Sequence, residues 1–179
     1  MDKIIATMWL KSDKITLRAP EPEDLELMYA MENDTALWSV GDTLLPYSRY
    51  TLRTYLEQSK QDLFAERQAR FVIALPGGEA VGMIDLAAYD PLNSRAEVCI
   101  GLLGNYEGKG IASEALRLLC EYSFKRLHIH QLYAYVSVEN TKSCNLFAKQ
   151  GFVDALVLKD WLRGEKGFSD VVLMQKIAE

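Results

Sequence analysis

Hydrophobic and polar positions along the chain follow two periods, one typical of strands and one typical of helices. Short apolar or alternating segments predict strands at 15–18, 71–75, 80–86, 96–103, 132–138, 153–161 and 168–177. Helical spacing predicts helices after Pro22 to about Met31, from near Ser48 through Leu63, from Gly110 to about Leu127 and from Asn140 to near Gly151. The order β-α-α-β-β-β-α-β-α-β-β predicts an α/β (α+β) fold, in which a mixed sheet carries helices on its faces.

One connection in this order is suited to bind an anion. After the strand at 96–103, the sequence Gly108-Lys109-Gly110 comes directly before an amphipathic helix. The N-terminus of a helix leaves backbone N–H groups free, and the helix dipole favours negative charge there. The glycine spacing is neither Gly-x-Gly-x-x-Gly nor Gly-x-x-x-x-Gly-Lys-Ser/Thr. The turn is therefore a candidate phosphate cradle of another kind, with a tight connection that binds no ligand as the alternative.

Composition restricts the class of protein. The chain has 179 residues, 49% hydrophobic and 25% charged, which is ordinary for one globular domain, so we expect a single domain over 1–179. A net charge of −5 argues against nucleic acid as a partner and favours a cationic small substrate or a basic protein tail. No leader-like or membrane-spanning segment is evident, so we expect a cytoplasmic protein without a membrane partner.

The three cysteines, Cys99, Cys120 and Cys144, lack paired or metal-ligand spacing. We expect them to be small buried hydrophobic residues, and we expect neither a disulfide nor a metal site.

Three segments together resemble the acetyl-CoA-binding core of the GNAT superfamily of N-acetyltransferases. They are Glu107-Gly108-Lys109-Gly110-Ile111-Ala112, Val138-Glu139-Asn140-Thr141-Lys142-Ser143 and Leu146-Phe147-Ala148-Lys149-Gln150-Gly151-Phe152. The resemblance runs from about Ile15 to Ile177 and extends to the spermidine acetyltransferase and ribosomal-protein alanine acetyltransferase branches. It implies a mostly antiparallel sheet of about seven strands, with splayed central strands and about four flanking helices, and it implies acetyl-CoA as cosubstrate.

The resemblance also assigns the residues that hold the cosubstrate. The pyrophosphate would lie on the backbone amides of the turn, and the pantetheine arm would add to the first central strand like an extra strand. Residues of the next helix would face the arm, and Asn140 would contact the arm, cap the helix, or do both. The cofactor-binding residues are thus Ile100, Gly101, Leu102, Glu107, Gly108, Lys109, Gly110, Ile111, Ala112, Ser113, Asn140, Ser143 and Phe147.

Acetyl transfer requires an amine that has lost its proton and a thiolate that gains one. Glu97 matches a position where the family often has an acidic base, and a structural or substrate-orienting charge is the alternative. Asp85, on the neighbouring strand, is the second acidic candidate, and we expect it to pair with a substrate ammonium rather than to act as a base.

The sequence departs from the family pattern at Phe147, where spermidine acetyltransferases have a tyrosine thought to protonate the thiolate. Tyr133 and Tyr135 alternate onto one face of their strand. We expect a core or cross-strand role for both, and one of them could replace the missing tyrosine only if that face meets the cofactor.

Substrate recognition is expected in the segment from Glu32 to Arg49, because loops on a fixed scaffold carry specificity. Acidic and aromatic side chains there would suit a polyamine or a protein N-terminus, and a solvated loop is the alternative. The candidates are Glu32, Asp34, Trp38, Asp42 and Tyr47.

Three functions follow from these residues. The first is direct transfer of acetyl, in a ternary complex, to a primary amine such as spermidine. The second is acetylation of a protein N-terminus, and the third is a CoA-binding sensor that has lost catalysis. By analogy with the family, a homo-oligomer is also expected.

Overall fold

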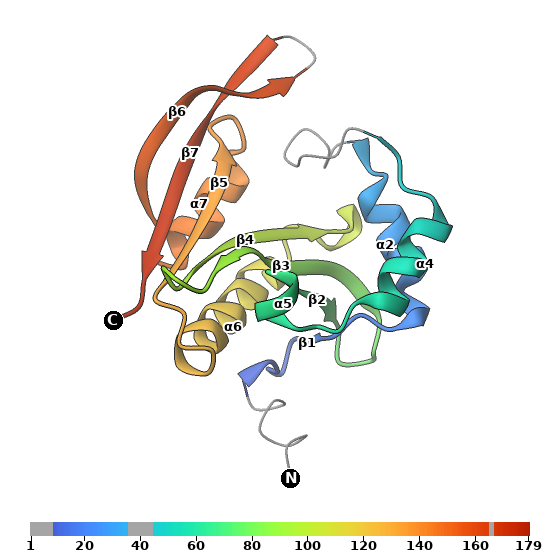
Figure 1. The fold of residues 1–179 in the computed structure, drawn as a ribbon. Coiled ribbons are helices and arrows are strands. Elements are labelled where there is room, and N and C mark those ends of the chain that lie inside the picture. Colours follow the sequence, from blue (N-terminus) through green and yellow to red (C-terminus); the bar gives the residue numbers. More distant parts are fainter. Residues whose placement is uncertain (1–8, 36–44, 165–166) are drawn as a thin grey trace.

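One seven-stranded sheet organises the chain in the computed structural model, which describes residues 9–35, 45–164 and 167–179. The strand order is β1-β2-β3-β4-β5-β7-β6 (Figure 1). The strands are β1 (Thr16–Arg18), β2 (Ala69–Ala74), β3 (Ala80–Asp90), β4 (Arg95–Leu102), β5 (Gln131–Ser137), β6 (Val153–Gly164) and β7 (Gly167–Ile177). The helices are η1 (Pro22–Asp24), α2 (Leu25–Glu32), α4 (Arg49–Gln58), α5 (Leu63–Glu66), η2 (Gly104–Tyr106), α6 (Ile111–Lys125) and α7 (Thr141–Lys149).

The predicted order of elements is confirmed, but the single helix expected from Ser48 through Leu63 is wrong. Ser48 caps α4 by accepting the Thr51 N–H at 3.0 Å. The helix stops at Gln58, and Asp62 starts α5 by accepting the N–H groups of Phe64 and Ala65. Gln61 adopts a left-handed φ of 52° between the two helices. The second cap, which competes with continued helical hydrogen bonding, explains the break.

The centre of the sheet opens between β4 and β5. Every other strand pair is antiparallel, whereas β4 and β5 are parallel. Their register contains only Arg95 with Gln131, Ala96 with Leu132 and Glu97 with Tyr133, although β4 continues to Leu102 and β5 to Ser137. The predicted splay of the central strands is confirmed, and the backbone of β4 beyond Glu97 has a free edge toward β5.

Helices cover the two faces of the sheet unequally (Figure 1). The main core lies on the α6 face, where strand residues such as Ile84, Val98 and Leu132 pack with Leu116 and Leu119 of α6. A smaller cluster of Met28, Met31, Leu52 and Met83 lies on the opposite side, which we call the α2 face. No helix in the described ranges is long and apolar enough to cross a membrane.

The expectation that all three cysteines are buried holds only for Cys120. Cys120 on α6 is buried and Cys144 on α7 is intermediate, but Cys99 is exposed. Cys99 lies between the inward-facing positions Val98 and Ile100 of β4, so strand alternation turns it to the α2 face.

Candidate active site

The glycine turn before α6 has the geometry of an anion cradle. Gly108 and Gly110 adopt φ of 74° and 77°, conformations that favour glycine. Among the residues that the structure describes, a Cβ added at either glycine would meet nothing within 4 Å, so no described residue fills the space over the turn. Gly110 is the N-cap of α6 and offers no side chain to satisfy the N–H groups of the first turn. These amides and the helix dipole fit a pyrophosphate.

Side chains around the cradle differ in what they offer. The Nζ of Lys109 lies 5.0 Å from the ring centroid of Tyr106. Glu107 forms an ion pair with Lys142, with 3.1 Å between Oε2 and Nζ. Ile111 is buried in the core, so only its backbone can serve the cradle. Ser113 accepts a hydrogen bond of 2.9 Å from Gln150, which ties α6 to the end of α7.

The free edge of β4 leads from the cradle toward the point where the central strands meet. Ile100 and Leu102 pack against the core, and Gly101 lies between them. On the other side of β4, Gly82 of β3 pairs with Leu102. A Cβ at Gly82 would lie 2.4 Å from the carbonyl oxygen of Gly101, so this contact between the backbones requires glycine.

Helix α7 borders the splay on the α6 face. Asn140 is its N-cap and accepts the Ser143 N–H at 3.1 Å, which confirms the predicted capping role. The Phe147 side chain is 3% exposed and makes an edge contact with Phe152, with ring centroids 5.0 Å apart. The structure places Phe147 in the core, and the roles of Asn140, Ser143 and Phe147 toward a cosubstrate stay predictions.

Glu97 lies on the last paired position before the strands diverge. It is opposite Ala87 of β3 and Tyr133 of β5, and it is partly buried. Its neighbours Ala96 and Val98 point into the core, so Glu97 points to the α2 face. Cys99, on the same face, has its Sγ 3.8 Å from Glu97 Oε1. Although the Cys99 residue is exposed to solvent, the protein packed around its thiol group raises the pKa by desolvation, and the Glu97 carboxylate adds to the rise, so the thiol stays protonated.

Asp85 is part of an ion-pair network that the sequence did not reveal. Arg70 of β2 binds Asp85 through Nε at 3.1 Å and Nη2 at 2.8 Å, and it binds Glu32 of α2 through Nη1 at 2.7 Å. The three side chains are 18–21% exposed. Burial raises the pKa of Asp85, and Arg70 opposes that rise. Asp85 and Glu32 raise the pKa of Arg70 despite its burial, so the guanidinium is charged.

Of the other predicted substrate residues, Asp34 is exposed just after α2 and Tyr47 is 40% exposed. Asn33 joins the two ends of this segment, because it donates to the Tyr47 carbonyl at 3.0 Å and accepts the Tyr47 N–H at 2.9 Å. Trp38 and Asp42 lie outside the described residues.

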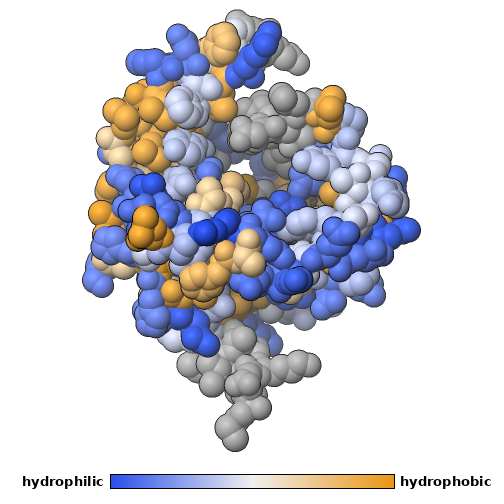
Figure 2. Space-filling model, viewed as in Figure 1, coloured by the Kyte–Doolittle hydropathy of each residue, from blue (hydrophilic) through white to orange (hydrophobic). Residues whose placement is uncertain are grey.

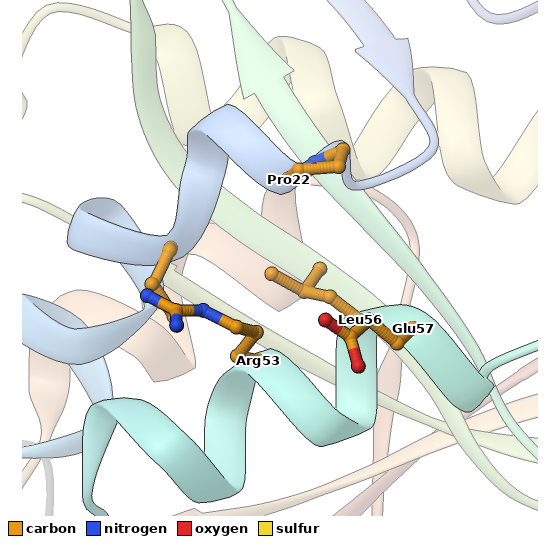
Figure 3. Close-up of a pocket in the computed structure, with 5 residues that line it drawn as sticks. Pro22, Arg53, Leu56 and Glu57 are labelled. Atoms are coloured by element: carbon orange, nitrogen blue, oxygen red, sulfur yellow. The ribbon is translucent and has the colours of Figure 1, made fainter.

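A separate pocket lies between η1 and α4. Its lining consists of Pro22, Leu25, Arg53, Leu56 and Glu57 (Figure 3). None of these residues belongs to β4, β5, α6 or α7, so this pocket is distinct from the candidate active site.

Sequence reasoning missed Arg70 and Gly82. The signal for Arg70 was a charged residue inside the strand-like run Ala69-Arg70-Phe71-Val72-Ile73-Ala74, where burial requires a charged partner. Gly82 lies inside a strand pattern, and an isolated glycine there indicates close approach of another backbone.

Comparison with known proteins gives the family. Residues 14–153 match the Acetyltransferase (GNAT) domain. A spermidine N(1)-acetyltransferase of Escherichia coli (strain K12) is 29% identical over 138 residues, which are 77% of this chain and 72% of that protein. A putative ribosomal N-acetyltransferase of Bacillus subtilis (strain 168) is 29% identical over 157 residues, which are 84% of each chain.

The fold agrees with a solved structure from the same group. The crystal structure of spermidine N-acetyltransferase from Vibrio cholerae in complex with CoA and spermine has a TM-score of 0.84 to this chain at 26% identity. The match covers 93% of this chain and 96% of that one. The chain belongs to the GNAT family of N-acetyltransferases, whose acetyl donor is acetyl-CoA.

Proposed function

We propose that this enzyme transfers acetyl from acetyl-CoA to a primary amine of a polyamine such as spermidine, by direct attack in a ternary complex. The observation that carries the substrate class is the set of carboxyl groups on the α2 face beside the splay. Glu32 and Asp85 both bind Arg70, and Glu97 lies on the same face. The similarity to spermidine acetyltransferases supports the same class.

The Arg70 network and Glu97 together suit a substrate with more than one ammonium group. The Glu32–Arg70–Asp85 network joins two carboxyl groups to one guanidinium. Partly buried charge acts through less solvent screening than surface charge. We infer that this network attracts a distal ammonium of the substrate while Glu97 meets the reacting amine.

Glu97 is the proposed base. An alkyl ammonium with a pKa of about 10 must lose its proton before it can attack the thioester. A carboxylate on the last paired position of β4 is adjacent to the free edge along which we place the pantetheine arm. Acetyl-CoA supplies the activated acetyl group, and the amides of Gly108 to Ser113 would hold its pyrophosphate.

A protein N-terminus is the second candidate substrate. The similarity to a putative ribosomal N-acetyltransferase favours it, and a basic peptide would also suit an acidic face. A single N-terminal ammonium would use Glu97 and leave the Arg70 network for basic side chains further along the peptide.

Release of free thiol from acetyl-CoA, measured with a panel of amines, separates these proposals. We expect saturable turnover with spermidine and spermine, and a kcat/KM at least about tenfold lower for butylamine, which has a single ammonium group. Turnover with N-terminal peptides alone would favour a protein N-terminus as the substrate. Tight binding of acetyl-CoA without turnover on any amine would support the non-catalytic sensor.

Glu97→Gln tests the base. We expect kcat at pH 7 to fall about 100-fold. The loss should shrink toward pH 10, because there the free amine forms without a base. Glu139→Gln, in an exposed turn, is the matched control and should retain full activity. An unchanged rate at both pH values in Glu97→Gln would remove Glu97 from this role.

We also propose that the chain forms a homo-oligomer. A related spermidine N-acetyltransferase from Vibrio cholerae is described as dodecameric. The β6–β7 hairpin projects from the sheet (Figure 1) and exposes an apolar group of residues: Val153, Leu156, Val157, Trp161 and Phe168. Exposed apolar groups of this kind are typical of protein interfaces.

A further inference from the structure

Acetyl transfer needs a group that protonates the departing CoA thiolate, and no residue of this chain has yet been assigned to that step. When the C–S bond of acetyl-CoA breaks, the thiolate needs a proton, and Phe147 has none to give. Phe147 is also buried against Phe152. Of the two strands that border the splay, β4 has no hydroxyl side chain, whereas β5 has Tyr133, Tyr135 and Ser137. Ser137 is at the far end of β5, where its Oγ accepts the Glu139 N–H at 3.3 Å.

The geometry indicates where the reacting end of the cosubstrate lies. The cradle at Gly108 and Gly110 follows the C-terminal end of β4. An arm that runs from the cradle along the free edge of β4 moves back toward Glu97. It must stop where β5 occupies that edge, at the pair of Glu97 and Tyr133. The thioester therefore comes to rest beside these two residues.

Tyr133 and Glu97 face the same side of the sheet. Leu132 and Ala134 are 0% and 1% exposed and belong to the core on the α6 face, so Tyr133 between them points to the α2 face. Glu97 does the same between Ala96 and Val98. An arm that ends at the last pair of the two strands would therefore meet this face. Neither tyrosine is buried in the core, but the cross-strand role expected for them is confirmed for Tyr135, which stacks on Trp161 of β6.

Tyr135 lies on the same face, but it packs toward β6, on the side of β5 away from β4. Its ring stacks on Trp161 of β6 with centroids 6.2 Å apart and an interplanar angle of 21°. In the strand order, β6 and β7 lie on the side of β5 away from β4. Tyr135 also contacts Tyr133 edge-on at 5.7 Å, which holds the Tyr133 ring in place.

The surroundings of Tyr133 keep its hydroxyl protonated. Burial raises the pKa of Tyr133, and the negative charge of Glu97 raises it further. Tyr135 and Cys99 also raise its pKa, and Arg95 lowers it. A neutral phenol is the form that can donate a proton.

We propose that Tyr133 is the general acid of the reaction, working with Glu97 as the base across one pair of strand residues. Glu97 takes a proton from the substrate ammonium, and the neutral amine attacks the thioester carbonyl carbon to form the C–N bond. The C–S bond breaks, and its electron pair goes to sulfur, which takes the Tyr133 hydroxyl proton. The second proton on the nitrogen passes to the Tyr133 phenolate, and the Glu97 carboxylic acid releases its proton to solvent, which restores both groups. The net reaction converts ammonium and acetyl-CoA to amide, CoA thiol and one proton.

Tyr133→Phe, with Tyr135→Phe as the matched control, tests the inference, which rests on Glu97 as the proposed base. We expect the single-turnover rate to fall about 100-fold in Tyr133→Phe while the Kd for acetyl-CoA stays within twofold. Tyr135→Phe should stay within about threefold of the wild-type rate. A loss under tenfold in Tyr133→Phe, or an equal loss in both variants, would overturn the assignment.

Fluorotyrosine at position 133 gives a second readout that does not depend on loss of the ring or hydroxyl. Fluorine lowers the phenol pKa, so the alkaline limb of the pH–rate profile should move to lower pH, and the same replacement at 135 should leave it in place. An unmoved limb at 133 would contradict the inference. Wild-type enzyme that releases no thiol with any amine would overturn both proposals, whereas an active wild type with an unaffected Tyr133→Phe would overturn this one alone.

Discussion

Arg70 is the cation of the ion-pair network on the α2 face. It is the shared partner of Glu32 and Asp85, from two different elements, and its pKa is raised by both carboxylates. Without it, two partly buried carboxylates would face each other. Asp85, taken from sequence as a direct partner of a substrate ammonium, thus acts in the proposal through a network and not as an isolated carboxylate.

Removing this guanidinium should be costly. We expect Arg70→Met to lower the free energy of unfolding by about 3 kcal/mol, because it leaves Asp85 and Glu32 without their cation. Arg117→Met is the matched control, since Arg117 also pairs with two carboxylates but is 41% exposed on α6. It should cost less than about 1 kcal/mol. Urea unfolding at pH 7 measures both, and equal losses would show that the Arg70 network contributes no more than a surface pair.

At the scale of elements, the junction of β1 and α2 depends on one buried carboxylate. Asp24 is 4% exposed, binds Arg18 at 2.6 and 2.8 Å and accepts the Glu21 N–H at 2.8 Å. Burial acts to raise the pKa of Asp24, but the Arg18 and Glu21 hydrogen bonds outweigh it and lower the pKa.

A lowered pKa in the folded state makes stability depend on pH in a known direction. The stabilisation from Asp24 is present above the unfolded pKa of about 4 and is lost as the pH falls through the lower folded value. We expect Asp24→Asn to cost about 1–3 kcal/mol at pH 7, and the difference from wild type should shrink as the pH falls below 4. Glu23→Gln, exposed in the same turn, should track wild type throughout. A constant gap at all pH values would contradict the assignment.

The second prediction at this scale concerns the close contact between the backbones of β3 and β4. In Gly82→Ala the new Cβ would lie 2.4 Å from the Gly101 carbonyl oxygen, so β3 and β4 must shift at the edge proposed for the pantetheine arm. We expect a loss of about 1–3 kcal/mol in stability and at least tenfold weaker binding of acetyl-CoA, measured by calorimetry. Gly77→Ala, in the turn before β3, should change neither quantity, because no described residue lies within 4 Å of the new Cβ. An unchanged affinity for acetyl-CoA in Gly82→Ala would show that this contact does not support the proposed binding edge.

At the scale of the whole molecule, the apolar group on the β6–β7 hairpin lies far along the sheet from the Arg70 network. Figure 2 shows hydrophobic residues gathered over this part of the surface. If this group is an interface, charge placed on it should dissociate the assembly. We expect Leu156→Glu with Phe168→Glu to reduce the mass measured by light scattering. Leu92→Glu, 91% exposed in the turn between β3 and β4, should leave the mass unchanged. A wild-type monomer would contradict the proposed oligomer.

The sequence alone determined most elements, because their signals are local. Period, caps and turn residues predicted the order of strands and helices, and the Asn140 cap and the glycine turn before α6 were read from neighbouring residues. The family motifs are contiguous and therefore visible without a structure. The break between α4 and α5 was missed because Asp62, which caps a new helix shortly after α4 ends at Gln58, fitted one continuous helical pattern equally well.

Only the tertiary structure decided which side chains share a site. Arg70, Asp85 and Glu32 are separated by up to 53 positions in the chain, and the strand register and the packing of α2 bring them together. The pairing of Glu97 with Tyr133 depends on where β4 and β5 stop being neighbours, which no local pattern encodes. Long-range pairing depends on the whole sheet, so the sequence indicated the cradle, whereas the charge network and the proposed acid–base pair required the fold.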